Sequence, residues 1–254
     1  MRPEEHRDLY SIEDDYWWFK AKRHLLIRTV KRTAKDSDGN AHLLDSGCGT
    51  GANLKEISKF LPVVGIEKYF EALKFCKKRS LDNLLNAELE HLPFRQETFD
   101  IVLAMDILEH VDDDLEALKE ISRVSKDGAI LIIHVPAFMF LWSDHDLAVD
   151  HKRRYTAGEL VECLKKANFK VKSINYRLCS FFILGILKKY LIKVKKLIKG
   201  DSKPQAYRPN VGRFINNILY IIVKMEDRIL NFIRLPFGLS ILCIAQKNEM
   251  EGKI

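Results

Sequence analysis

Short apolar runs alternate with helical patterns through the middle of the chain, from residue 40 to residue 176. The apolar runs predict strands at residues 42–45, 63–66, 84–87, 99–105, 128–135 and 169–176. The helical patterns predict helices at residues 53–60, 69–79, 113–124 and 156–167. A capping-box pattern, Thr156 followed by Glu159, marks the start of the last helix. Strands that alternate with helices of about ten residues predict a parallel sheet with helices on both faces.

The alternation stops at both ends of the chain. Residues 4–35 form a mostly helical pattern that contains an aromatic run, Tyr16 to Phe19. Residues 180–199 and 211–233 form two long helical patterns, joined by the polar linker GDSKPQAYRPN. An apolar run at residues 239–245 predicts a last strand. With it, the expected fold is a doubly wound α/β fold with a mostly parallel, seven-stranded sheet.

This pattern divides the chain into four parts. They are an N-terminal helical cap (1–39), a cofactor-binding α/β core (40–177), a basic helical insertion (178–235), and the last core strand with its tail (236–254). The length of 254 residues, with 47% hydrophobic residues, suits one large domain with an added subdomain.

Several features of the composition point to the cytoplasm. The opening MRPEEHRD is unlike a signal peptide, and no apolar stretch reaches the roughly 18 residues of a spanning helix. The five cysteines are scattered and form no CxxC pair, which argues against a disulfide framework or a thiolate metal site.

The net charge of +7 is concentrated in one segment, since residues 181–200 hold six lysines and no acid. On a helical projection from Leu187, the lysines fall in a sector of roughly 80° to 240°, and most apolar residues fall opposite. Two interpretations remain open. The helix packs on its own domain or on the second long helix, or residues 181–199 make a peripheral contact with the inner face of a membrane. A basic patch confined to one insertion gives little support to nucleic-acid binding.

The stretch LLDSGCGTGAN predicts a ligand site behind the first core strand. Gly47, Gly49 and Gly51 follow the strand in the spacing G-x-G-x-G, which is neither the dinucleotide nor the phosphate-loop pattern. Asp45 precedes the loop, and its charge would repel a pyrophosphate but attract an ammonium group. Glu67 ends the second strand, where an acid accepts hydrogen bonds from ribose hydroxyls. A charged amino acid joined to a nucleoside fits both, and S-adenosylmethionine is such a molecule.

Five stretches in order resemble the class I S-adenosylmethionine-dependent methyltransferases. They are LLDSGCGTG (43–51), VVGIEKY (63–69), AELEHLPFRQETFD (87–100), FDIVLAMDILEHVDD (99–113) and RVSKDGAILIIHVP (123–136). The resemblance implies a Rossmann-like methyltransferase fold, S-adenosyl-L-methionine as cofactor, and methyl transfer as the reaction.

The resemblance also implies a set of cofactor-binding residues. Glu67 would hold the ribose, Glu88 and Leu89 would meet the adenine, and Asp45 with the loop backbone would hold the methionine part. Trp18 and Arg23 are candidates for a lid, although the aromatic run has a second interpretation as plain packing of the first helix. The full expected set is Trp18, Arg23, Asp45, Ser46, Gly47, Gly49, Gly51, Asn53, Glu67, Lys68, Glu88, Leu89, Met105 and Asp106.

The expected acceptor site lies just past the fifth strand, where charged and imidazole side chains crowd residues 145–155. For a hydroxyl acceptor, His110, His145 and His151 are the candidate catalytic bases. Arg153, Arg154 and Tyr155 are the expected substrate-binding residues, and for a carboxylate acceptor the arginines could orient it without a base. The alternative is a structural loop whose arginines pair with surface acids. We expect no metal, because the pair His145 and His151 lacks a clean third ligand.

YWWFKAKR and the stretch from residue 135 to 156 resemble one subgroup of these methyltransferases, which is associated with glycan or lipid modification. The main hypothesis is therefore methyl transfer to a small-molecule, glycan or lipid-linked acceptor. One rival is a nucleotide-dependent oxidoreductase, which the loop spacing and Asp45 oppose. Another is a non-catalytic cofactor-binding module that docks a membrane or partner through the basic helix. A nucleic-acid methyltransferase is not favoured, because the fourth strand ends without a [DN]-P-P-[YF] motif. The oligomeric state is open.

Overall fold

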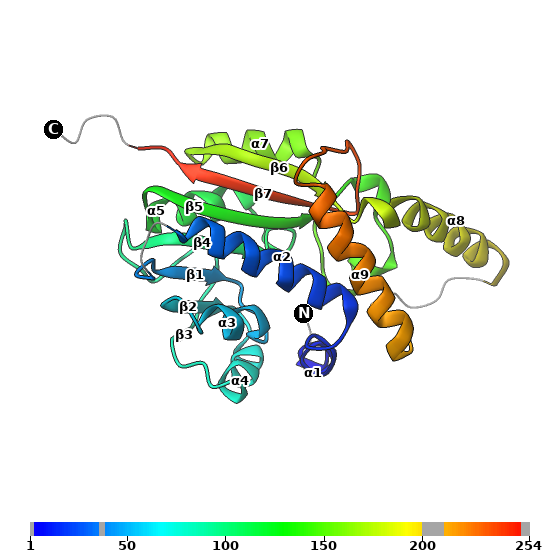
Figure 1. Ribbon diagram of the computed structural model, residues 1–254, viewed down its shortest axis with the longest axis horizontal. Coiled ribbons are helices and arrows are strands. Elements are labelled where there is room, and N and C mark those ends of the chain that lie inside the picture. Colours follow the sequence, from blue (N-terminus) through cyan, green and yellow to red (C-terminus); the bar gives the residue numbers. More distant parts are fainter. Residues whose placement is uncertain (1–2, 36–38, 200–210, 250–254) are drawn as a thin grey trace.

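The computed structural model describes residues 3–35, 39–199 and 211–249, so the predicted linker at residues 200–210 lies outside the described residues. Its centre is one sheet with the strand order β3-β2-β1-β4-β5-β7-β6 (Figure 1). The strands are β1 (Leu43–Ser46), β2 (Val63–Glu67), β3 (Leu84–Asn86), β4 (Phe99–Met105), β5 (Ser125–Pro136), β6 (Phe169–Arg177) and β7 (Ser240–Lys247). The first five run parallel, and β7 pairs antiparallel with both β5 and β6. The predicted seven-stranded, mostly parallel sheet is confirmed.

Helices cover both faces of the sheet because successive strand residues point to opposite sides. Leu43 belongs to a core cluster that includes Leu26 of α2, whereas Leu44 belongs to a second cluster that includes Leu118 of α5. The helices are α1 (Pro3–Ile12), α2 (Trp17–Thr33), α3 (Ala52–Ile57), α4 (Phe70–Lys78), α5 (Asp114–Val124), α6 (Asp144–Ala148), α7 (Ala157–Lys166), α8 (Phe182–Lys199) and α9 (Arg213–Ile229). The predicted capping box of α7 is present, with Thr156 and Glu159 bonded reciprocally.

The N-terminal region forms two helices, and the aromatic run begins the second one. Trp17 stacks on Phe181, with the ring centroids 5.2 Å apart. The Asn216 side chain of α9 accepts a hydrogen bond from the Trp17 backbone N–H at 2.9 Å and donates one to the Asp15 carbonyl at 2.9 Å. The helix α9 therefore satisfies the backbone at the start of α2, where a helix has no internal partners.

Among the described residues, the main packing of the two long helices of the insertion is not against each other, which was one possibility that the sequence offered. The helix α9 packs on α2 instead, and α8 contacts the short helical turns Met139–Leu141 and Cys179–Phe181. In the described part of α8, large apolar side chains remain exposed: Ile183, Leu184, Leu187, Tyr190 and Leu191. No helix in the described residues is long and apolar enough to cross a bilayer.

Candidate active site

A cavity of about 1190 Å³ opens at the carboxyl ends of the parallel strands. Its walls come from α1 and α2, the loops after β1, β2 and β4, the segment 136–154, and the start of α8. Ligands of open parallel sheets bind at this edge. The volume exceeds the roughly 300–1,000 Å³ of common ligand sites, so it has room for a cofactor and a second molecule.

The glycine loop forms one end of the cavity. Gly47 and Gly49 have φ angles of 102° and 55°, in the left-handed region that favours glycine. A Cβ on Gly47 would lie 2.8 Å from the Ile107 side chain, whereas a Cβ on Gly49 would meet nothing within 4 Å. The first glycine thus allows the loop to pack against the β4 loop, and the second leaves bare backbone at the cavity.

The Glu67 carboxylate links the tips of β1 and β2. It accepts hydrogen bonds from the backbone N–H of Gly49 and of Tyr69, both at 3.0 Å. The side chain is buried yet lines the cavity, and burial raises the pKa of its carboxyl. Its position agrees with the expected contact to ribose hydroxyls.

The Asp45 carboxylate lies behind the same loop and is only 1% exposed. Neither of its oxygens has a hydrogen-bond partner among the described residues. Burial, followed by the charge of Glu67, raises the pKa of Asp45 to about 7. A buried, unpaired carboxylate is costly. Asp45 does not itself line the cavity, so the ammonium group of S-adenosylmethionine would compensate its charge from the other side of the glycine loop.

Most of the predicted cofactor residues do line the cavity. These are Trp18, Arg23, Gly47, Gly49, Asn53, Glu67, Lys68, Leu89, Met105 and Asp106. The structure does not bring Asp45, Ser46, Gly51 and Glu88 to its surface. Ser46 instead donates to the Leu103 carbonyl at 2.5 Å, and Gly51 packs against Leu81.

The placement of Glu88 corrects the sequence prediction directly. Glu88 is exposed and forms an ion pair with Lys68 at 2.8 Å. Glu90, two residues further on, lines the cavity in its place. The sequence could not choose between them, because the loop after β3 has no periodicity that fixes which acid points inward.

A buried ionic network, which the sequence did not indicate, fastens the N-terminal helices to the glycine loop. Arg79 is 3% exposed and donates to Glu13 at 2.8 Å, to Asp14 at 2.9 Å and to the Thr50 carbonyl at 3.0 Å. Arg23 donates to the Glu13 carbonyl at 2.6 Å. These contacts hold α1 and α2 over the cavity, which favours a covering role for Trp18 and Arg23.

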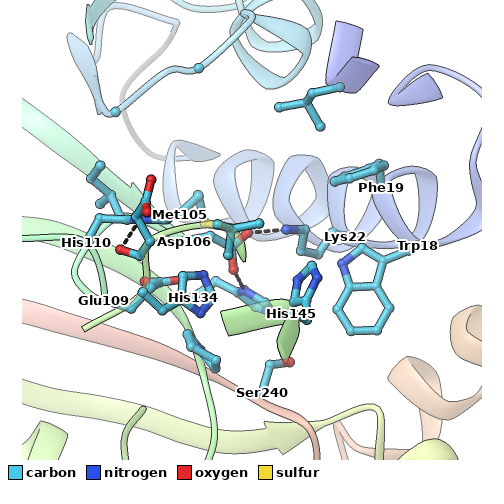
Figure 2. Close-up of a pocket in the computed structure, with 18 of the residues that line it drawn as sticks. Trp18, Phe19, Lys22, Met105, Asp106, Glu109, His110, His134, His145 and Ser240 are labelled. Carbon is cyan, nitrogen blue, oxygen red and sulfur yellow. Dashed lines mark hydrogen bonds and ion pairs between the residues drawn. The ribbon is translucent and has the colours of Figure 1, made fainter. Parts of the chain in front are cut away.

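Asp106 stands at the tip of β4, where the two halves of the cavity meet (Figure 2). One oxygen lies 2.6 Å from His134 Nδ1 and the other accepts a hydrogen bond from Lys22. Burial opposes ionisation, but Lys22 and then His134 hold the pKa of Asp106 well below its usual range. The carboxylate is therefore ionised and already compensated by the protein. Neither Lys22 nor His134 was predicted from the sequence.

The far half of the cavity contains the three predicted imidazoles, His110, His145 and His151. Asp146, at the start of α6, is completely buried and accepts hydrogen bonds from His151 Nδ1 at 2.9 Å and Arg154 Nε at 2.8 Å. Burial alone would raise the pKa of Asp146, but these two partners keep it well below its usual value.

Glu109 faces the same imidazoles. His151 Nε2 lies 3.8 Å from a Glu109 oxygen, and the rings of His110 and His151 are 4.8 Å apart. Burial and the charge of Asp106 raise the pKa of Glu109 well above its usual value. Burial and the neighbouring His151 lower the pKa of His110 to about 4, so this imidazole is neutral near pH 7.

Two predicted substrate-binding residues serve the structure instead. Arg153 pairs with Asp114 at 2.9 Å, and the Tyr155 hydroxyl donates to Asp114 at 2.8 Å. Neither residue lines the cavity, whereas Arg154 does. The structural alternative therefore describes Arg153, and Tyr155 is bound to the same acid, Asp114.

The sheet order, the glycine loop at β1 and the acid that ends β2 are those expected of the Rossmann-like fold of class I methyltransferases. Residues 44–133 match the family model described as "Methyltransferase domain". The chain thus carries a domain of this class, with S-adenosyl-L-methionine as its cofactor.

Known proteins agree with this assignment. A "Probable S-adenosylmethionine-dependent methyltransferase" of Mycolicibacterium smegmatis is 23% identical over 65% of this chain and 64% of its own. A solved methyltransferase of Mesorhizobium loti superposes with a TM-score of 0.58 at 14% identity, covering 92% of this chain and all (100%) of that chain. The cyclase SpnF has a TM-score of 0.55 at 19% identity over 88% of this chain and 81% of its own. These structural likenesses show the fold alone. The chain spans less than two thirds of the length of the curated relatives that it matches first.

Proposed function

We propose that this chain transfers the methyl group of S-adenosylmethionine to a hydroxyl group of a lipid-linked or similarly amphiphilic acceptor. One observation carries the proposal. A continuous cavity joins the glycine loop and Glu67 at one end to the imidazoles and Glu109 at the other, and it reaches the exposed apolar helix α8. Donor and acceptor held in one cavity gain the large rate advantage of proximity and orientation.

The polar groups of the far half favour a hydroxyl over a carboxylate acceptor. A carboxylate would need a free guanidinium group, but Arg154 is committed to Asp146 and the Ala137 carbonyl. Arg153 is committed to Asp114 outside the cavity. The imidazole of His110, which is neutral near pH 7, is instead suited to accepting the proton of a hydroxyl group.

The rim of the cavity supports an amphiphilic acceptor. Leu184 and Lys189 of α8 line the cavity, and Leu184 is also exposed to solvent. Met139 and Phe140 expose further apolar surface beside α8, whose Lys189 donates to the Phe140 carbonyl. A contiguous apolar surface of this kind marks an interaction site.

The insertion supports contact with an anionic membrane. The helix α9 also exposes large apolar side chains, namely Phe214, Ile215, Ile218, Ile221, Ile222, Met225 and Ile229. The sequence of α8 adds six lysines without an acid. An apolar face flanked by lysines is the composition of helices that lie in a bilayer interface.

Methyl transfer can be tested with radiolabelled S-adenosylmethionine and lipid extracts, separated by thin-layer chromatography. We expect a labelled lipid whose label survives mild alkaline hydrolysis, because methyl ethers resist it and methyl esters do not. Glu67→Gln should abolish the label, while the exposed Glu116→Gln should not change it. Label in an alkali-labile product would disprove the hydroxyl acceptor, and no label in any extract would count against the proposal as a whole.

Membrane contact can be tested by pelleting with vesicles of phosphatidylcholine and phosphatidylglycerol. We expect Leu187→Asp with Leu191→Asp to reduce the bound fraction severalfold, because both side chains are exposed and neither lines the cavity. Lys119→Gln with Lys165→Gln lowers the net charge by the same amount on α5 and α7 instead and is the matched control. Equal binding by both double variants would contradict the role of α8.

A further inference from the structure

Three side chains that are distant in the sequence converge in the acceptor half of the cavity. Glu109, His110 and His151 each place one potential metal-ligating atom within 4.8 Å of the other two. Glu109 and His110 follow β4, whereas His151 lies after α6, so only the folded chain brings them together. Figure 2 shows Glu109 and His110 next to each other at one end of the cavity.

Glu109 lacks the partners that a buried carboxylate requires. The residue is 1% exposed, and its Oε2 atom has no hydrogen-bond partner among the described residues. The distance of 3.8 Å from its other oxygen to His151 Nε2 is too long for a hydrogen bond. A buried carboxylate is stable only when it is paired, protonated or bound to a cation.

The neighbouring cations do not supply that partner. Lys22 is bound to Asp106, and Arg154 is bound to Asp146 through two of its nitrogens. Both acids are thereby satisfied within the protein. Glu109 is therefore the buried carboxyl group of this half of the cavity that no neighbouring lysine or arginine compensates among the described residues.

The two imidazoles are oriented as metal-ligating histidines usually are. His151 Nδ1 lies 2.9 Å from the buried Asp146 carboxylate, and His110 Nδ1 lies 3.3 Å from the Asp150 carbonyl oxygen. When Nδ1 carries the proton and donates to these oxygens, the lone pair of Nε2 is left for a ligand. A hydrogen bond from the second ring nitrogen to a carboxylate or carbonyl is the common outer support of a histidine ligand.

We propose that Glu109, His110 and His151 bind one divalent first-row transition-metal ion, such as Zn²⁺, with its remaining coordination positions open to the cavity. Two imidazoles and one carboxylate are a ligand set that such ions accept and that leaves room for substrate. Ligands held at about 2.1 Å in a tetrahedral arrangement lie about 3.4 Å apart. The observed separation of His151 Nε2 and Glu109 needs only a small closure to reach this value.

The catalytic consequence rests on the proposed function, but the binding of the ion does not. An ion at this position would lower the pKa of a coordinated hydroxyl group, as metal ions do for bound water. It would thereby assist the proton loss that methylation of a hydroxyl requires.

Metal binding can be measured on the untagged full-length chain after treatment with a chelator. Equilibrium dialysis against ZnCl₂, followed by elemental analysis, should give one ion per chain. Glu109→Gln and His151→Asn should each lower the affinity at least 100-fold, and Asp146→Asn should lower it about tenfold through the orientation of His151. The matched controls are His91→Asn and Glu116→Gln, which alter exposed residues outside the cavity and should bind as the unchanged chain does.

Binding of S-adenosylhomocysteine to each variant separates this proposal from the proposed function. Retained cofactor binding shows that the variant is folded. Substoichiometric zinc in the unchanged chain would overturn the metal site, as would equal zinc affinity in the Glu109→Gln variant. A site that takes Mg²⁺ but not Zn²⁺ would overturn the class of ion proposed.

Discussion

The two halves of the cavity are assembled in different ways. The cofactor half comes from the glycine loop and Glu67, which follow adjacent strands early in the core. The acceptor half combines the β4 loop, the segment around α6, and the start of α8, which are spread over more than seventy residues (Figure 1). One half is thus encoded by local motifs, and the other exists only after the fold has formed.

The buried acids around the cavity also differ in what compensates them, and this difference occurs within the acceptor half as well as between the halves. Asp106 and Asp146 are neutralised by cationic side chains of the protein. Asp45 and Glu109 each keep at least one buried oxygen without a hydrogen-bond partner among the described residues. Because a buried carboxylate without a partner is costly, this difference separates acids that build the structure from acids that await a ligand.

The largest effect is expected for Glu67→Gln, which tests the cofactor half. A carboxylate that accepts from two ribose hydroxyls makes charge-assisted hydrogen bonds, and the loss of one acceptor oxygen affects both. We expect the affinity for S-adenosylhomocysteine to fall about 100-fold in isothermal titration calorimetry. A loss of less than threefold in a folded variant would remove Glu67 from the ribose site.

The next effect is a pH dependence that originates at Asp45. Its pKa of about 7 means that much of the carboxyl is protonated in the cofactor-free chain below neutral pH. Cofactor affinity should therefore rise about tenfold from about pH 6 to about pH 8, as the carboxylate that attracts the ammonium group forms. Asp45→Asn should bind more weakly at both pH values and should lose this slope. An unchanged slope in the variant would assign the titration to another group.

Asp45→Asn should at the same time stabilise the cofactor-free chain. A pKa raised by burial lowers stability as the pH rises from the unfolded value near 4 toward 7, because only the unfolded chain ionises freely in that range. The variant removes this cost. Its thermal midpoint at about pH 8 should exceed that of the unchanged chain by a few degrees.

A smaller effect is expected when Asp106 loses its compensating lysine. Lys22→Met should lower the free energy of unfolding by about 1 kcal/mol, because the Asp106 side chain is partly solvated and the pair is screened accordingly. The depressed pKa of Asp106 contributes stability above the unfolded pKa near 4, so the difference from the unchanged chain should shrink as the pH falls below about 4. Lys55→Met on the exposed side of α3 is the control for denaturant unfolding. Equal losses at about pH 7 and about pH 3 would contradict the electrostatic cause.

The contrast between local motifs and contacts that form only in the fold also explains what the sequence could predict. The seven strands, and their alternation with helices along the chain, follow from periodicity, because each strand needs only its own residues to be recognised. The position of Glu67 followed in the same way from the end of an apolar run. The break between α1 and α2 was not predicted, since the contacts that fix it come from Asn216, about 200 residues away.

The sequence predicted less well the roles of residues whose neighbours come from distant parts of the chain. His151 was predicted as a candidate base, and no metal was expected because its pair with His145 lacked a third ligand. In the fold, its near neighbours include Glu109 and His110 from another loop. Arg153 and Tyr155 were predicted to bind substrate because they lie in the charged segment after the fifth strand, but both are bound to Asp114 outside the cavity. Nothing in the spacing of residues within one segment encodes these distances.

The smallest effect is expected at the adenine end, where two acids compete for one role. Glu88 is half exposed and pairs with Lys68 at the surface, whereas Glu90 lines the cavity. Glu88→Gln should therefore change the affinity for S-adenosylhomocysteine by less than twofold, and Glu90→Gln should change it more, both measured by calorimetry under the same conditions. The reverse order would mean that the loop after β3 shifts its register when the cofactor binds. In that case the cofactor half, too, would depend on contacts that only the complete site provides, and the contrast between the two halves would be one of degree.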